Sequence, residues 1–310
     1  MSDPLENEIN PEGIEKAEMV VCIPSYNEAD SINYPATQAD KGLVKYFSDK
    51  SAVIINCDNN SPDNTRQAFL NTPTKIPKIY LTTPPGIKGK GNNFRNLFQK
   101  VVDLDAKAVV VVDADLKSIT PEWIKHLGEP LFSGFSYVAP LYVRHKYDGT
   151  ITNGIAYPMT RALYGSRVRQ PIGGDFGFSG ELGAVYLKNK GWDDSVANFG
   201  IDIWMTTLAI NRQVQICQSF MGRPKIHRTK DPEHLRPEED QGPTSLPLAH
   251  LHLEACPAFD LPGYVVQPAL EGEHVFEPTA RGTDLGSHEV ERIQPSNGPS
   301  GWVGPAVACW

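Results

Sequence analysis

Short apolar runs alternate with amphipathic stretches along the chain up to about residue 237. The clearest run is VVVVDADL at 109–116, whose four consecutive valines are typical of a strand buried on both faces of a sheet. Similar runs at 19–23, 52–57, 136–143 and 213–220 predict further strands. Because helix-like stretches separate these runs, the pattern predicts an α/β fold with a mostly parallel sheet flanked by helices.

Several helices can be predicted from local sequence. Apolar residues with helical spacing occur at Phe94, Leu97, Phe98, Val101 and Val102. Thr120 with Pro121, and Ser61 with Pro62, have the residue types of an N-cap followed by the first helical position. The apolar stretch FGIDIWMTTLAI at 199–210 predicts another helix.

The pattern divides the chain into three parts. Residues 1–17 are predicted to be a flexible lead-in, and 18–237 a single domain. Pro and Gly become frequent and periodicity disappears in 238–310, so no strand or helix is predicted beyond residue 242. This composition predicts a poorly structured or disordered tail, and out-of-frame translation is an open alternative.

Composition excludes some classes of partner. A net charge of −8 and a pI of about 5.5 provide no basic surface for nucleic acid or an anionic membrane. The five cysteines are scattered without a C-x-x-C pair, which indicates reduced thiols. The acidic N-terminal stretch has no apolar signal region, and no apolar run is long enough for a membrane span, so a cytoplasmic protein is expected.

Carboxylates follow two of the predicted strands. Asp113 and Asp115 end the valine run, and Asp58 ends the run at 52–57. In open α/β sheets the carboxyl ends of the strands are where ligands bind. Paired carboxylates there suit Mg²⁺ or Mn²⁺, which could in turn hold a nucleotide diphosphate. A polar turn after the valine run and an Asx-turn at Asp58 are the structural alternatives.

A glycine- and lysine-rich loop precedes the helix that contains Phe94. Gly86, Gly89 and Gly91 surround Lys88 and Lys90, a combination that allows a phosphate to approach a helix N-terminus and neutralises its charge. The spacing differs from the Walker pattern, and a flexible solvated loop is the alternative.

Polar residues in the second half of the domain are weaker candidates. Arg144, Asp148 and Thr152 form a set that could receive a small acidic acceptor, although a surface turn would contain similar residues. Asp175 lies in the glycine-rich stretch QPIGGDFG, which is typical of backbone packed closely against a ligand or another strand. His227 could complete a divalent-cation site with Asp115.

Seven short motifs occur in a family-specific order. They are IPSYNE, DNNSPDNT, GKG, DAD, QPIGGD, FGID and IHR. In this order the chain resembles GT-A nucleotide-sugar glycosyltransferases over about 19–236. More narrowly, it resembles the retaining enzymes that make mannosylglycerate, glucosylglycerate and glucosyl-3-phosphoglycerate.

The resemblance implies a GT-A, Rossmann-like fold, a divalent cation (Mg²⁺ or Mn²⁺) and a UDP- or GDP-hexose donor. Asp115 would be the main metal ligand, with Asp113 assisting and His227 joining it. The residues that the resemblance assigns to nucleotide binding are Pro24, Tyr26, Glu28, Asp58, Lys90, Asp113 and Ala114.

The same resemblance assigns the residues around the sugar and the acceptor. Gly174 and Asp175 would lie by the donor sugar, and Asp202 would hold sugar or acceptor hydroxyls. Asp175, Asp202 and Lys90, the last at the phosphates, form the implied catalytic set. The implied acceptor-binding residues are Arg144, Asp148, Thr152 and Lys225. Two departures matter, because Thr150 and Lys225 stand where the 3-phosphoglycerate enzymes have arginines. With fewer fixed cations, free glycerate is the expected acceptor.

The expected function is metal-dependent, retaining transfer of a hexose to a small hydroxy acid such as D-glycerate. Transfer to 3-phosphoglycerate is one alternative. A sugar-phosphate nucleotidyltransferase is another, although it would need a glycine-rich loop where this chain has IPSYNE. A non-catalytic nucleotide-sugar binding homologue is the third. The expected partners are small molecules and not nucleic acid, and homo-oligomerisation stays open.

Overall fold

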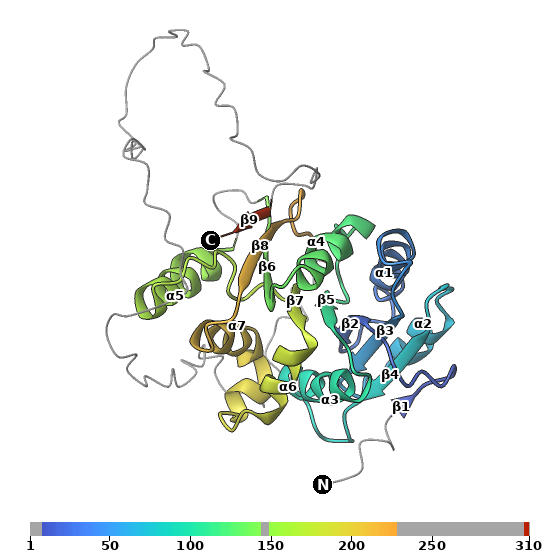
Figure 1. The fold of residues 1–310 in the computed structure, drawn as a ribbon. Helices are drawn as coiled ribbons and strands as arrows, with labels where there is room; N and C mark the ends of the chain where they lie inside the picture. The colour runs from blue at the N-terminus through green and yellow to red at the C-terminus, as the bar shows by residue number, and fades with distance from the viewer. Residues whose placement is uncertain (1–7, 144–148, 228–306, 310) are drawn as a thin grey trace, which may run out of the picture. The chain divides into compact units, whose positions relative to one another are not determined.

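A nine-stranded sheet forms the centre of the described part of the chain (Figure 1). The structure is a computed structural model that describes residues 8–143, 149–227 and 307–309. Along the sheet the order is β1-β4-β3-β2-β5-β7-β6-β8-β9. The strands are β1 Glu8–Ile9, β2 Met19–Ser25, β3 Ala52–Asp58, β4 Lys78–Thr82, β5 Ala108–Val111, β6 Tyr137–Leu141, β7 Phe176–Ser179, β8 Ile216–Phe220 and β9 Val307–Cys309.

Six of the nine strands run in one direction, and β1, β7 and β9 run opposite to them. The predicted mostly parallel α/β sheet is therefore confirmed. β7 lies between β5 and β6 and is antiparallel to both, so these two parallel strands do not pair with each other.

Helices cover both faces of the sheet. The α-helices are α1 Asn33–Tyr46, α2 Thr65–Asn71, α3 Lys90–Asp103, α4 Pro121–Phe132, α5 Tyr157–Tyr164, α6 Gly180–Lys188 and α7 Ile201–Asn211. Two π-helical segments, η2 Thr152–Ala156 and η3 Val196–Gly200, lead directly into α5 and α7. Side chains of α3, α6 and α7 contribute to one core, whereas α1 and α4 contribute to the core on the opposite face.

Alternation along β2 explains this two-sided packing. Val20 and Cys22 belong to the core under α3, and Met19, Val21 and Ile23 belong to the core under α1 and α4. All five side chains are fully buried. Because successive residues of a strand point to opposite faces, a continuous apolar run buries both faces of the central strands.

Local predictions were right for some elements and wrong for others. Thr120 is the N-cap of α4 and Pro121 its first residue, as predicted. The cap predicted at Ser61 and Pro62 is wrong, because α2 begins at Thr65 with Asn64 before it. Ser61 instead donates its backbone N–H and its hydroxyl to the Asp58 carboxylate, at 2.7 and 2.6 Å. It therefore closes the turn after β3 rather than capping the helix.

The end of the chain also differs from expectation. No strand was predicted beyond residue 242, but Val307–Cys309 form β9 and pair antiparallel with β8. Without β9, β8 would present the unpaired N–H and C=O groups of an edge strand, which a short extended segment satisfies. The other residues of the predicted tail, and residues 1–7 of the predicted lead-in, lie outside the described residues. The rest of the lead-in is described, and its residues Glu8–Ile9 form β1 and pair with β4.

The strand directions bring several polar chain segments to one edge of the sheet. β2, β3, β5 and β6 all end at this carboxyl edge.

No helix in the described ranges combines the length and apolarity needed to cross a lipid bilayer.

Replacing Gly180, the first residue of α6, tests the packing between α6 and the start of β5. Its N–H donates to Lys107 O at 2.9 Å, and an added Cβ would overlap the carbonyl oxygen of Ala106. Gly180→Ala is expected to lower the free energy of unfolding by about 2 kcal/mol or more, because the two backbones must separate. The measurement is chemical denaturation followed by circular dichroism.

Gly154→Ala in η2 is the matched control, since an added Cβ there meets nothing within 4 Å. It is expected to leave stability unchanged or to raise it by up to about 1 kcal/mol. Equal stability of the two variants would contradict the packing argument.

Candidate active site

Asp115 and His227 come together at the carboxyl edge although they are far apart in sequence. Lys117 N–H donates to Ile226 O at 2.8 Å, and Ile226 N–H donates to Ser118 Oγ at 2.9 Å. These backbone contacts hold the two segments side by side. As a result Asp115 Oδ1 lies 3.0 Å from His227 Nδ1, with the aspartate side chain 15% exposed and the histidine 42% exposed.

Lys90 forms a second charged contact at the same edge. Its Nζ lies 3.1 Å from Asp202 Oδ2 and 3.6 Å from Asp113 Oδ1. Burial alone would lower the pKa of Lys90, but these two carboxylates raise it above its ordinary value, so the ammonium form is favoured. Asp202 Oδ1 is buried and has no hydrogen-bond partner among the described residues. This oxygen is therefore a buried acceptor whose hydrogen-bonding capacity the described residues leave unused.

Two of the glycines around Lys90 lie against another segment of the protein, and the predicted phosphate contact of this loop stays a prediction. An added Cβ at Gly89 or Gly91 would overlap the backbone carbonyls of Ala197 or Val196 in η3. Gly89 also has φ +113°, a conformation that residues with a Cβ rarely adopt. The glycines therefore let η3 pack against the start of α3, and this packing sets the position of Lys90.

A buried network lies behind Lys90. Lys225 Nζ is 2.8 Å from Asp113 Oδ2, 2.8 Å from Asp175 Oδ2 and 2.7 Å from Gly173 O. Asp175 is fully buried, and its Oδ1 accepts from Asp113 N–H at 2.9 Å. Tyr142 donates its hydroxyl to Asp175 Oδ2 at 2.5 Å.

The network controls which groups are charged. Burial raises the pKa of Asp113, but Lys225 and Lys90 outweigh it and hold that pKa well below its ordinary value. Burial and the Asp113 charge raise the pKa of Asp175, and Lys225 and Tyr142 oppose this. The donors that contact the Asp175 oxygens favour its ionised form and oppose burial, but the balance leaves the pKa of Asp175 above its ordinary value.

The donor set fits a divalent cation. Two ligands at adjacent corners of a six-coordinate Mg²⁺ ion, each at about 2.1 Å, lie about 3 Å apart. Asp115 Oδ1 and His227 Nδ1 form a hydrogen bond at 3.0 Å, and the same separation would suit two adjacent ligands of such an ion. Three carboxylates share two ammonium groups at this edge, and a fourth, that of Asp115, contacts His227, so two formal negative charges remain if the histidine is neutral. These groups are Asp113, Asp115, Asp175, Asp202, Lys90 and Lys225.

The protein ligands alone are incomplete. Within the described ranges no three His, Cys, Asp or Glu side chains group together as a metal site. Asp113, the predicted assisting ligand, is turned to Lys225 and Lys90 instead. Its role and those of Asp115 and His227 as metal ligands stay predictions, and ligand oxygens would have to complete the coordination.

The residues predicted to bind a nucleotide begin at the end of β2. Pro24 is buried within that strand, Tyr26 is 41% exposed and Glu28 is buried with its carboxylate accepting from Ser31 Oγ at 2.5 Å. Asp58 is fully buried, and its oxygens accept four hydrogen bonds, from the hydroxyls of Ser25, Tyr80 and Ser61 and the N–H of Ser61. Among these four residues, Tyr26 is the one with an exposed side chain.

The predicted acceptor residues are only partly described. Arg144 and Asp148 lie outside the described residues. Thr152 begins η2 and is buried, and its Oγ1 accepts from Gln170 Nε2 at 3.4 Å. Thr150 is exposed.

Tyr142 is a site residue that the sequence prediction missed. It directly follows β6, and β6 ends at the same edge as β5. The sequence did contain a signal for Tyr142. It lies near the carboxyl end of the strand predicted at 136–143, and that end of a parallel strand belongs to the ligand-binding edge of the sheet. The partner of its hydroxyl, Asp175, could not be predicted because β7 runs antiparallel.

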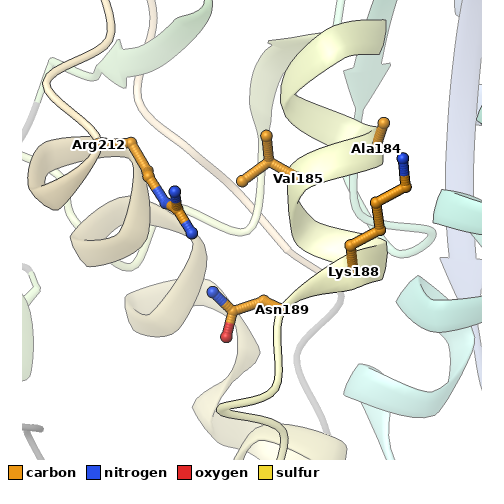
Figure 2. A pocket seen from close by; sticks show the side chains of 5 residues that line it. All are labelled: Ala184, Val185, Lys188, Asn189 and Arg212. Carbon is orange, nitrogen blue, oxygen red and sulfur yellow. The ribbon is translucent and has the colours of Figure 1, made fainter.

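A separate hollow of about 270 Å³ lies away from these candidate residues (Figure 2). It is lined by Ala184, Val185, Lys188, Asn189 and Arg212. Figure 2 shows Arg212 reaching from the end of α7 toward Asn189, which follows α6. None of the predicted site residues lines it, and the chemistry of the carboxyl edge makes that edge the better candidate site.

Comparison with solved structures identifies the fold. Glucosyl-3-phosphoglycerate synthase from Mycobacterium tuberculosis, solved with Mn²⁺, UDP and glucosyl-3-phosphoglycerate, is similar at a TM-score of 0.54 and 21% identity, covering 71% of this chain and 75% of that one. This chain has the GT-A fold. The same enzyme with Mn²⁺, UDP-glucose and phosphoglyceric acid is similar at a TM-score of 0.53 and 21% identity, covering 71% and 74%.

Other comparisons set the limits of this likeness. A further mycobacterial protein of known structure is similar at a TM-score of 0.52 and 22% identity, covering 71% of this chain and 70% of that one. No protein-family model and no curated protein sequence matches this chain. At such identities the likeness establishes the GT-A fold, and the chemistry must be argued from this chain's own residues.

Gly174 provides a test of the geometry around Asp113 in this GT-A domain. Its φ is +73°, and an added Cβ would lie 2.5 Å from Asp113 Oδ2. Gly165 has a similar φ of +65° but open space around it. Gly165→Ala is expected to cost about 1 kcal/mol from backbone strain, and Gly174→Ala about 1–3 kcal/mol more from the steric conflict. Urea unfolding curves of both variants measure the difference, and equal losses would show that Asp113 is not held against Gly174.

Proposed function

We propose that this protein is a metal-dependent, retaining glycosyltransferase that moves a hexose from a UDP- or GDP-sugar to a small hydroxy acid such as D-glycerate. The observation that supports this most strongly is the pairing of Asp115 with His227 at 3.0 Å, at the carboxyl edge of a GT-A sheet. The solved relatives with this fold bind Mn²⁺ or Mg²⁺ together with UDP, which suits the same pair of ligands here.

The difficult step is cleavage of the bond between the sugar and the diphosphate, which leaves negative charge on the diphosphate. Asp115 and His227 would hold the cation, with Asp113 at its side. When bound, that cation acts as a Lewis acid that stabilises the developing charge. Lys90 adds a fixed positive charge beside it, oriented by Asp202.

Asp202 is the proposed hydrogen-bond acceptor for a hydroxyl of the donor sugar. Its Oδ2 is held by Lys90 and its Oδ1 is buried without a partner among the described residues, so a donor-sugar hydroxyl would satisfy it. No side chain is assigned as a covalent nucleophile. The resemblance to retaining enzymes favours front-face attack, with the acceptor hydroxyl giving its proton to the departing phosphate.

The nucleotide would lie along the ends of β2 and β3. Tyr26 is exposed there for contact with the base, with Pro24 and Glu28 around it. Asp58 keeps its role as a candidate for the base or ribose, although its carboxylate is already engaged by protein donors. Ala114 lies between the two acids of the DAD motif, where its backbone would border the phosphates.

Free glycerate is the favoured acceptor because few positively charged side chains are placed to bind the phosphate group of a phosphorylated acceptor. Thr150 stands at a position where the 3-phosphoglycerate enzymes of the resembled group have an arginine. Lys225 stands at a second such position, and all its donors are engaged by protein groups. Transfer to 3-phosphoglycerate is kept as the second candidate, since the solved relatives were crystallised with phosphoglyceric acid.

A donor-by-acceptor matrix tests the proposal. UDP-glucose, GDP-glucose and GDP-mannose are each incubated with glycerate, 3-phosphoglycerate or lactate, with and without Mg²⁺, and nucleotide release is measured. Metal-dependent release with glycerate is expected. A preference for 3-phosphoglycerate would overturn the acceptor assignment, and nucleotide binding without release for any pair would favour a non-catalytic homologue. Formation of a nucleotide sugar from a sugar phosphate and nucleoside triphosphate would instead identify a nucleotidyltransferase.

Asp115→Ala is expected to lower metal-dependent nucleotide release at least about a hundredfold. The reason is that Asp115 would hold the cation that stabilises the negative charge on the departing diphosphate. His227→Ala should act in the same direction. Asp103→Ala, an exposed acid on α3, is the control and should retain normal activity. Near-normal release by Asp115→Ala would refute the metal assignment.

A further inference from the structure

The three protons of the Lys225 ammonium group already have three acceptors. These are Asp113 Oδ2 at 2.8 Å, Asp175 Oδ2 at 2.8 Å and Gly173 O at 2.7 Å. An ammonium group has three donors and no acceptor. The side chain is also only 7% exposed. Lys225 therefore has no donor left for the carboxylate or phosphate of an acceptor.

Both carboxylate oxygens of Asp175 are also engaged by protein donors. Its Oδ1 accepts from the backbone N–H of Asp113 at 2.9 Å, and its Oδ2 accepts from Tyr142 at 2.5 Å and faces Lys225 at 2.8 Å. The residue has no exposed surface. A sugar hydroxyl could reach this carboxylate only if the core opened.

Tyr142 is itself fixed in place. Its ring centroid lies 5.7 Å from that of Trp123, a fully buried residue of α4, and Lys225 Nζ lies 5.5 Å from the same ring. Because the ring is held by α4, the hydroxyl that reaches Asp175 has a defined direction. The three side chains Tyr142, Asp175 and Lys225 are called the clamp below.

We propose that Lys225, Asp175 and Tyr142 are positioning residues that hold Asp113 and the Asp115–His227 pair in place, and that neither Lys225 nor Asp175 contacts the substrates. This inference rests on the proposed function for its meaning in catalysis. It replaces the roles implied by the family resemblance, which were acceptor binding for Lys225 and contact with the donor sugar for Asp175.

The clamp acts on the backbone close to the candidate metal ligands. β5 ends at Val111, so the strand ladder no longer holds the chain at Asp113. The hydrogen bond from Asp113 N–H to Asp175 takes over that function, and Lys225 fixes the Asp113 side chain. Asp113 precedes Asp115 by two residues, and Lys225 precedes His227 by two residues. The ion pair between Asp113 and Lys225 thus restrains both segments that carry the candidate metal pair.

Charge makes the clamp interdependent. Without Lys225, the carboxylates of Asp113 and Asp175, which now share one ammonium group, would face each other with no cation between them. Removing one partner of a buried ion pair is strongly destabilising, whereas removing both charges is much less so. Neutralising Asp175 should therefore compensate in part for the loss of Lys225.

The test compares Lys225→Met, Asp175→Asn, the double variant and Lys225→Arg, with Lys188→Met as the matched control. Lys188 is an exposed lysine at the hollow of Figure 2. Three quantities are measured: the affinity of the folded protein for UDP with Mn²⁺ by calorimetry, the KM for the acceptor, and the urea midpoint of unfolding.

Lys225→Met is expected to weaken Mn²⁺–UDP binding at least tenfold while the acceptor KM changes less than twofold. The double variant should lose less affinity than the product of the two single fold-changes, and its urea midpoint should fall by less than the sum of the two single shifts. Lys225→Arg should recover at least part of the affinity, because arginine can hold both carboxylates. Lys188→Met should behave as the unaltered protein does.

Two results would overturn the inference. If Lys225→Met raises the acceptor KM tenfold and leaves Mn²⁺–UDP affinity unchanged, Lys225 contacts the acceptor. If the folded variants bind Mn²⁺–UDP normally, the clamp serves stability alone. Failure of the unaltered protein to bind Mn²⁺–UDP would instead refute the proposed function. In that case the unfolding data still decide, because strictly additive effects of Lys225→Met and Asp175→Asn would show that the clamp does not exist.

Discussion

Compensation of buried charge at the carboxyl edge is the constraint on which the rest of the site depends. Three carboxylates, Asp113, Asp175 and Asp202, share two ammonium groups, those of Lys90 and Lys225. Each charge would be costly to bury alone, so each side chain has a direction set by its partners. The arrangement leaves an excess of negative charge beside Asp115 and His227, which is the electrostatic condition that a divalent cation requires.

Close backbone packing places these charged groups. Gly89 and Gly91 allow η3 to lie against the start of α3, and Gly174 allows the Asp113 carboxylate to approach its backbone. A side chain at any of the three positions would push a charged residue away from its partner. The glycines therefore serve the geometry of the protein itself, and the flexibility or phosphate contact that such residues suggest in a sequence is not needed to explain them.

The fold and the chemistry are supported by different observations. The GT-A fold is established by similarity to solved structures at 21–22% identity, which is too low to transfer an activity. The proposed transfer reaction depends on the charged groups of this chain, above all the Asp115–His227 contact. Lys225 illustrates the difference, because its equivalent position in the resembled enzymes suggests acceptor binding, whereas its three protein contacts here point to a positioning role.

The sequence alone determined the central strands, because a valine run such as 109–116 can be buried only between two apolar layers. It also determined that Asp113, Asp115 and Asp58 stand at strand ends, and that Thr120 begins a helix. Tertiary structure alone decided the antiparallel insertion of β7, the pairing of β9 with β8, and the partners of Asp175 and Lys225. Hydrophobic periodicity is a local property that identifies buried faces. Strand neighbours and ion-pair partners far apart in sequence depend instead on how those faces pack together.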